Sequence, residues 1–199
     1  MMIIYHAPAP LPYTPLKVAF VTGLSDPNSC SLSLLYRQFM AELDCLEAWK
    51  IYLNFPYIPG SNQPENTPIL KAGLANWSQF LGARSPKYRA AIRFHLANIA
   101  TSSERSFFIA GSCGLEILNQ AWTAAIAPNQ LHIMALGPVA RTYSPMPCTM
   151  VQGSRDYISR YFFSQVDVLV PGVNHMGYVQ NADVFALVNA QLRHVVSSL

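Results

Sequence analysis

The chain of 199 residues and 22.0 kDa is long enough for one domain with a substantial core. Charged residues make up only 12% of it, against about 25% in an average globular domain, and apolar residues make up 51%. This composition excludes a disordered chain, and the net charge of +3 is too small to indicate a nucleic-acid-binding protein. The shortage of charge fits a surface that is paired with a second copy, as in a homo-oligomer, or that lies against lipid.

The N-terminal segment, residues 1–16, is rich in proline and lacks the features of a secretory signal. It has no basic start, and Pro8, Pro10 and Pro12 interrupt the stretch where an apolar core would run. No apolar run elsewhere approaches the ~18 residues that span a bilayer. We therefore expect a cytoplasmic protein without a transmembrane segment, whose single domain occupies residues 17–199.

The cysteines of the chain are Cys30, Cys45, Cys113 and Cys148. They form no CxxC pair and have no metal-ligand spacing with a histidine, so they predict no metal site. Their even number would also allow disulfides. Free thiols in a reducing compartment are the simpler interpretation for a chain of this size.

The first third of the chain predicts two strands separated by a helix. Residues 17–24 form an apolar run of strand composition that reaches a glycine near its end. After a polar loop, apolar residues recur from residue 34 to residue 46 at the spacing of an amphipathic helix. Residues 49–57 again have strand composition, and a loop rich in proline, asparagine and glycine follows over residues 59–68.

The rest of the chain alternates predicted helices and strands. The helices are expected at residues 86–100, 115–126 and 176–199, and the strands at residues 106–110, 131–136, 148–151 and 166–170. Most of these strands are apolar on both faces, which predicts a parallel sheet that helices cover on both sides. The predicted fold is a single α/β domain with a mostly parallel sheet of about six strands.

A serine follows the third predicted strand at a turn flanked by small residues. In the segment AGSCG, residues 110–114, small residues stand two positions before and two positions after Ser112. A strand-to-helix turn that exposes a nucleophile is so tight that larger side chains there would collide. Cys113 is the alternative nucleophile because a thiol is intrinsically more reactive, but Leu115 would then crowd the turn. We favour Ser112, with the backbone N–H of Cys113 donating to an oxyanion.

A carboxylate and a histidine follow the fifth and sixth predicted strands. Asp156 comes after a glycine turn, and His175 lies in the loop before the last helix. Each has a simpler interpretation, because Asp156 could cap the next helix and a loop histidine is often merely exposed. Functional residues of parallel sheets gather at the carboxyl ends of the strands, so we expect Ser112 to meet both. Asp167 is the alternative carboxylate, although it lies inside the sixth predicted strand.

With the order Ser…Asp…His, the chain resembles the α/β-hydrolase superfamily from residue 17 to its C-terminus. The resemblance is carried by AGSCG, VQGSRD and the stretch that begins VLVPGVNHMGYVQ. It implies a compact serine esterase or thioesterase with Ser112 as nucleophile, Asp156 as acid and His175 as base. It also implies that residues 17–199 are a catalytic domain without a lid domain, since only residues 137–147 separate the fourth and fifth predicted strands.

The superfamily places a second oxyanion donor in the loop after the first of these strands, commonly behind a His-Gly pair. Here the pair is Thr22-Gly23, so the histidine is missing, and the resemblance implies that the backbone N–H of Leu24 is the donor. No metal or organic cofactor is implied. The further glycines that a dinucleotide-binding loop needs do not follow Gly23, which argues against that interpretation.

Two functions compete at this point. The first is hydrolysis of a carboxylic ester or thioester through an acyl-enzyme on Ser112, with the acyl group attached to a carrier protein, coenzyme A or a lipid. The second is a non-catalytic binding or scaffold protein, for which Ala110 and Thr22 would be signs of a decayed site. We favour the enzyme because three triad residues occur in the expected order. Cations between residues 71 and 105 would suit an acidic carrier or an anionic headgroup, or would simply form a solvated helix face.

Overall fold

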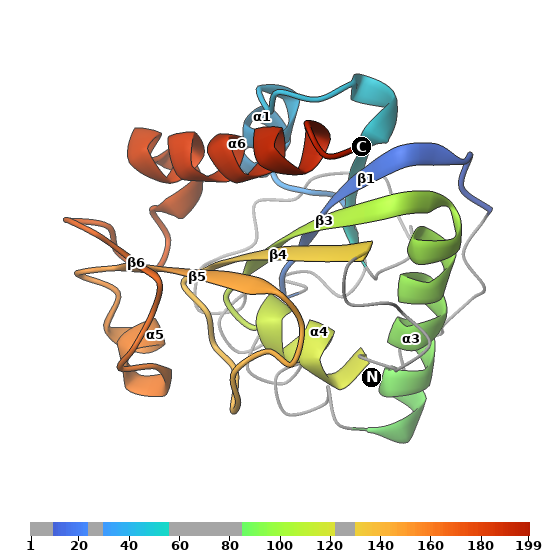
Figure 1. Cartoon of the computed structure of the whole chain (residues 1–199). Coiled ribbons are helices and arrows are strands. Elements are labelled where there is room, and N and C mark those ends of the chain that lie inside the picture. The colour runs from blue at the N-terminus through green and yellow to red at the C-terminus, as the bar shows by residue number, and fades with distance from the viewer. Residues whose placement is uncertain (1–9, 24–29, 56–84, 122–129) are drawn as a thin grey trace.

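The computed structural model describes residues 10–23, 30–55, 85–121 and 130–199. Six strands form one parallel sheet in the order β2-β1-β3-β4-β5-β6, with helices on both of its faces (Figure 1). This arrangement confirms the predicted α/β class. The strands are β1 (Thr14–Val21), β2 (Lys50–Phe55), β3 (Ser103–Gly111), β4 (Leu131–Leu136), β5 (Cys148–Gly153) and β6 (Val168–Val170).

The described helices cover the sheet in two layers. Helices α1 and α6 lie on one face, and α3 and α4 lie on the other (Figure 1). The helices are α1 (Leu34–Ala41), α3 (Pro86–Thr101), α4 (Gly114–Ala121), α5 (Tyr157–Phe162) and α6 (Ala182–Val196), with 3₁₀ turns η1 (Glu47–Trp49) and η3 (Tyr178–Gln180).

Strand pairing accounts for the differences from the predicted strand ends. Strand β1 begins at Thr14 rather than at residue 17, because Thr14 already pairs with Ser103 of β3. Strand β5 continues to Gly153 because its last residues pair with β6, where Gly153 stands opposite Val170. Hydrogen bonds to neighbouring strands thus lengthen elements beyond their apolar runs.

The last predicted helix is divided in the structure. The turn η3 comes first, and α6 begins only at Ala182, where the Asn181 side chain accepts the backbone N–H of Val184 at 3.0 Å. Helix α1 ends at Ala41, earlier than predicted, while α4 covers the described part of the helix expected over residues 115–126. The cap at Asn181 therefore separates the histidine loop from the helix that follows it.

Alternate residues of the strands supply two apolar layers. In β1, Leu16, Val18 and Phe20 belong to the cluster beneath α1 and α6, whereas Ala19 and Val21 belong to the cluster beneath α3 and α4. All five are fully buried. A strand buried on both faces cannot alternate apolar with polar residues, which explains the continuous apolar runs of the sequence.

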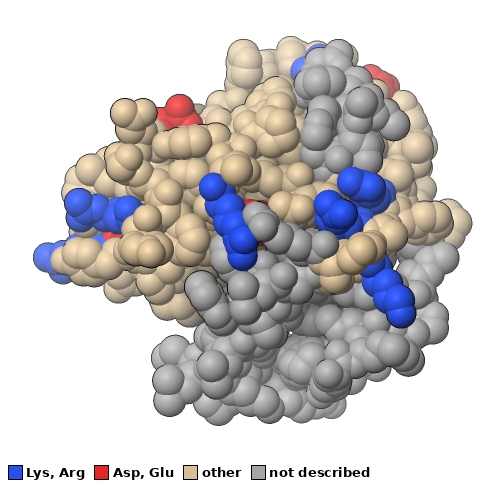
Figure 2. Space-filling view, turned by 90° about the horizontal axis from the view of Figure 1, so that it is seen from below, with Lys and Arg blue, Asp and Glu red and all other residues tan. Residues whose placement is uncertain are grey.

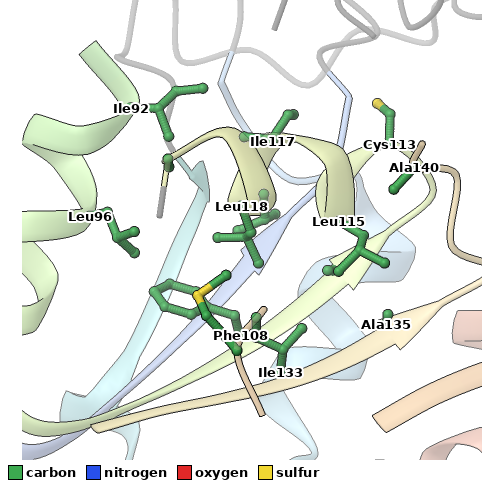
Figure 3. Close-up of a cluster of buried hydrophobic side chains, with 14 of the residues drawn as sticks. Ile92, Leu96, Phe108, Cys113, Leu115, Ile117, Leu118, Ile133, Ala135 and Ala140 are labelled. Atoms are coloured by element: carbon green, nitrogen blue, oxygen red, sulfur yellow. The ribbon is translucent and has the colours of Figure 1, made fainter. Parts of the chain in front are cut away.

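Helix α4 is fixed to the sheet by its apolar side (Figure 3). Leu115 and Leu118 extend from α4 toward Phe108 of β3 and Ile133 of β4, and side chains of α3 close the cluster at one end (Figure 3). Burying one such leucine stabilises the fold by roughly 2 kcal/mol. Because α4 begins at Gly114, this packing also anchors the turn that carries Ser112.

The face that carries α3, α4 and α5 displays mostly cationic charge (Figure 2). Helix α3 contributes Lys87, Arg89 and Arg93 and contains no acidic residue. Arg105 does not join them, because its guanidinium donates to Ser198 Oγ at 2.6 Å and to the Ser198 carbonyl at 2.7 Å, beyond α6. Two further cations of the predicted run lie outside the described residues. Within the described ranges, no helix is long and apolar enough to cross a membrane.

Candidate active site

Ser112 stands at the tip of a sharp turn between β3 and α4. Its φ is +52°, a left-handed conformation that costs a non-glycine residue about 1–2 kcal/mol. Two backbone hydrogen bonds hold it there, since Ser112 N–H donates to Leu136 O at 3.1 Å and Ser112 O accepts from Val139 N–H at 3.0 Å. Strained backbone that the surroundings enforce in this way is typical of functional sites.

The residues that flank Ser112 are small for steric reasons that the structure makes explicit. A Cβ on Gly114 would lie 2.0 Å from the Val21 carbonyl oxygen, so the turn passes directly over the end of β1. Ala110, two residues before Ser112, is fully buried in the sheet, so a methyl group fits where the G-x-S-x-G pattern has glycine. The departure at Ala110 therefore leaves the turn intact.

Cys113 is buried behind the turn. Its side chain is 2% exposed, and burial above all, with the charge of Glu116, raises the pKa of its thiol to about 12. A thiol that stays protonated at neutral pH is a poor nucleophile. The loop after β1 lies beside the turn, since a Cβ on Gly114 would lie 3.5 Å from Thr22 Cα.

The structure brings Ser112, His175 and Asp156 into one hydrogen-bonded chain. Ser112 Oγ lies 3.0 Å from His175 Nε2, and His175 Nδ1 lies 3.0 and 2.9 Å from the two Asp156 carboxylate oxygens. The His175 side chain is 18% exposed, and that of Asp156 is fully buried. With Nδ1 protonated, Nε2 is free to accept the serine proton. This arrangement can activate a hydroxyl for attack on an electrophilic carbon.

Asp156 has both of the positions that the sequence suggested for it, since it caps a helix and also faces His175. Its Oδ1 accepts the backbone N–H of Ser159 at 2.9 Å and so caps α5, while the same carboxylate faces His175. Burial by itself raises the pKa of the Asp156 carboxyl. Hydrogen bonds from His175, the Ser159 backbone and Tyr178 outweigh burial and hold that pKa below its ordinary value. The carboxylate is therefore ionised at neutral pH.

The turn that carries Asp156 is joined to the loop that carries His175. Arg155 N–H donates to Val173 O at 3.0 Å, and Ser154 N–H donates to Val170 O at 2.9 Å. A Cβ on Gly153 would lie 2.2 Å from the Val173 carbonyl oxygen, so only glycine permits this approach. The backbone thereby fixes the distance between acid and histidine.

Two buried residues of the site are not recognisable in the sequence. Tyr178 donates its hydroxyl to Asp156 Oδ2 at 2.7 Å and accepts the Gly153 N–H at 2.8 Å. Asn54, at the end of β2, accepts the Thr22 N–H at 3.1 Å and donates to Gly23 O at 3.2 Å, which holds the loop after β1. Tyr178 lies within the stretch VLVPGVNHMGYVQ, but its spacing indicates no role, and Asn54 belongs to no motif. Both act through contacts with segments far along the chain.

The other expected site residues have separate locations. Asp167 is exposed and accepts the Met150 N–H at 2.7 Å near the start of β5, so it does not meet His175. Leu24, the expected second oxyanion donor, lies outside the described residues, as does the predicted loop over residues 59–68. Across the described part of the chain, no group of three or more His, Cys, Asp or Glu side chains could hold a metal ion.

Neither a protein-family model nor a curated protein sequence matches this chain. Solved structures do. The esterase PE8 superposes with a TM-score of 0.54 at 14% identity, over 92% of this chain and 94% of its own. A protein of unknown function from Agrobacterium tumefaciens, described as a candidate α/β hydrolase, gives a TM-score of 0.49 at 14% identity, over 96% of this chain and 90% of its own. The likeness to PE8 over nearly all of both chains shows that the two chains share a fold, which agrees with the predicted compact α/β-hydrolase-like arrangement of one parallel sheet.

Proposed function

We propose that the protein is a serine hydrolase that cleaves a carboxylic ester or thioester through an acyl-enzyme on Ser112. The observation that carries this proposal is the hydrogen-bonded chain from Ser112 Oγ through His175 to the buried Asp156 carboxylate. The α/β-hydrolase fold supports it by analogy only, since one fold hosts many functions.

In the proposed mechanism, Ser112 Oγ attacks the acyl carbon while His175 Nε2 takes the serine proton. The ionised Asp156 holds the Nδ1–H tautomer and stabilises the imidazolium that forms. Collapse of the tetrahedral intermediate transfers the proton from Nε2 to the departing alcohol or thiol. A water molecule, deprotonated by the same nitrogen, then releases the acid and restores Ser112. This chemistry requires no metal or organic cofactor.

Backbone donors would stabilise the oxyanion of both tetrahedral intermediates. The Cys113 N–H directly follows the nucleophile, and the Leu24 N–H is the proposed second donor. Losing one such donor typically costs about 3–4 kcal/mol of transition-state stabilisation. The sharp turn at Ser112 supports the role of Cys113, because a left-handed serine places the next amide beside its own side chain.

The scaffold alternative predicts a site without reactive chemistry. Labelling by a fluorophosphonate probe separates the two functions, because the probe reacts only with an activated serine. We expect stoichiometric labelling of the wild type, none of Ser112→Ala, and labelling of Cys113→Ala. Absence of labelling in the folded wild type would favour the scaffold function. Labelling that persists in Ser112→Ala would show that another residue is the nucleophile.

We further propose that the acyl group is presented on a carrier protein, coenzyme A or a lipid. Exposed apolar side chains near the site support this, namely Leu34 (68% exposed) and Leu35 (44%) in the first turn of α1 and Met176 (69%) beside His175. Tyr36 of the same helix packs edge-on against Phe20 near the end of β1, with the ring centroids 4.7 Å apart, and the turn of Ser112 passes over that end of β1. An apolar rim can bury apolar surface of a large substrate, and a small soluble ester offers little such surface.

The test of this substrate class compares kcat/KM for one acyl group on a small alcohol and on each large carrier. Higher values on a carrier are expected. Equal values, or a preference for the small ester, would favour a small-molecule esterase.

A further inference from the structure

We propose that Tyr178 is a positioning residue of the site, whose hydroxyl fixes the Asp156 carboxylate in the orientation that faces His175. The proposal rests on the function proposed above, because it assigns Tyr178 a part in the same reaction. The tyrosine does not touch Ser112 or the reacting atoms in this proposal. It acts only through Asp156.

The direction of the hydroxyl proton follows from the donors around it. A phenol has one proton to donate, and here the Gly153 N–H already donates to the oxygen at 2.8 Å. The proton is therefore available for Asp156 Oδ2, which lies 2.7 Å away. Gly153 thus orients Tyr178, and Tyr178 orients the acid.

The tyrosine ring cannot move away from this arrangement without a rearrangement of the core. Tyr178 is 5% exposed and belongs to the cluster beneath α1 and α6. A Cβ on Gly137, whose φ is +56°, would lie 2.6 Å from the ring and 2.7 Å from Asp156 Oδ2. Glycine at this position therefore makes room for the ring and the carboxylate together.

The hydroxyl and the Ser159 amide divide the two carboxylate oxygens between them. Ser159 N–H binds Oδ1, Tyr178 binds Oδ2, and both oxygens still face His175 Nδ1. Among the residues that the structure describes, the titratable groups that act on Asp156 are His175 and Tyr178. Burial and the adjacent carboxylate raise the pKa of Tyr178, so the phenol remains a donor throughout the working pH range.

A role in positioning predicts an effect on the ionisation of Asp156 that a packing role would not produce. The test is the pKa of Asp156 from the ¹³Cγ resonance in wild type and Tyr178→Phe, with Tyr157→Phe as the matched control on an exposed tyrosine. We expect the pKa of Asp156 to rise by about one unit or more in Tyr178→Phe, as for loss of a hydrogen bond to a charged group. No change is expected in Tyr157→Phe.

The same change should appear in catalysis. In Tyr178→Phe, kcat/KM is expected to fall about tenfold or more, and the acid limb of its pH profile should move to higher pH. The effect should lie in kcat rather than in KM, because Tyr178 does not contact the substrate. A fall in activity with an unshifted pH profile and an unchanged pKa of Asp156 would overturn the proposal.

A second variant keeps the test valid if Tyr178→Phe does not fold. A fluorinated tyrosine inserted at position 178 retains both hydrogen bonds and makes the hydroxyl a stronger donor, so the pKa of Asp156 should fall. An unchanged value would contradict the proposal. Because the resonance of Asp156 is measured without substrate, these results stand even if the wild type hydrolyses no ester, which would refute the proposed function alone.

Discussion

The two halves of the site are built in different ways. The nucleophile half is local, since a single strand-to-helix turn places Ser112 at φ +52° over the end of β1. The acid half is assembled from three segments, around Gly137, Asp156 and Tyr178, whose contacts are side-chain hydrogen bonds and close backbone approaches. The nucleophile half depends on the size of a few neighbouring residues, whereas the acid half depends on the correct register of the whole sheet.

Removing the acid should have the largest effect. In Asp156→Asn, kcat is expected to fall by about 10⁴-fold, because the amide favours the wrong imidazole tautomer and cannot stabilise the imidazolium. Asp167→Asn is the matched control and should retain activity, since the Asp167 carboxylate accepts the Met150 N–H of β5, whereas His175 Nδ1 is bonded to Asp156. Steady-state kinetics on an activated ester measure both. If the kcat of Asp156→Asn were close to that of the wild type, the acid half of the site would have no part in the reaction.

A single added methyl group at Gly114 is the most direct test of the nucleophile half. Gly114→Ala should lower the free energy of unfolding by about 3 kcal/mol, because its Cβ would meet the Val21 carbonyl at 2.0 Å. Gly111→Ala is the control, since its Cβ would meet only side-chain atoms at 3.5 Å or more, and should change stability by less than about 1 kcal/mol. Urea denaturation gives both values. Equal losses would mean that the close approach at Gly114 relaxes without strain.

The acid half should also leave a signature in the pH dependence of stability. The pKa of Asp156 is lower in the folded state than in the unfolded chain, so its stabilisation is present above pH ~4 and is lost as the pH falls through the folded value. The quantity to follow, at pH ~5 and below, is the difference in unfolding free energy between wild type and Asp156→Asn. Below pH ~4 it should shrink by at most about 1.4 kcal/mol per pH unit. If this difference in unfolding free energy grew below pH ~4, the pKa of Asp156 would be higher in the folded state than in the unfolded chain, which would contradict the prediction.

Removal of the Cys113 thiol should have the smallest effect on activity. Cys113→Ala keeps the backbone N–H, so kcat/KM should stay within a few-fold of wild type, while stability falls by about 1 kcal/mol from the small cavity. The measurement is the same ester assay on folded protein. An inactive but folded variant would show that the sulfur itself takes part.

Much of the fold was predictable because its signals are local. Each strand of the sheet coincides with an apolar run. Ser112, Asp156 and His175 could be predicted to lie together because they follow the third, fifth and sixth strands, whose carboxyl ends share one edge of the sheet. Strand ends were less predictable, as at Thr14, where pairing with Ser103 extends β1 into the proline-rich segment. The break before α6 was missed because the Asn181 cap interrupts a stretch whose residues are otherwise compatible with one helix.

The sequence by itself determined the α/β class, the turn around Ser112 and the candidates Asp156 and His175, because helix and strand periodicity and the size of turn residues act over a few positions. Only the tertiary structure placed Asp156, and not Asp167, against His175, buried the Cys113 thiol, and placed Tyr178 and Asn54 beside the candidate site. The hydrogen bonds behind these outcomes join residues that are 17 to 31 positions apart in the sequence. Such contacts leave no local pattern in the sequence, because a tyrosine or an asparagine in the same sequence context could lie on the surface or in the core of another fold.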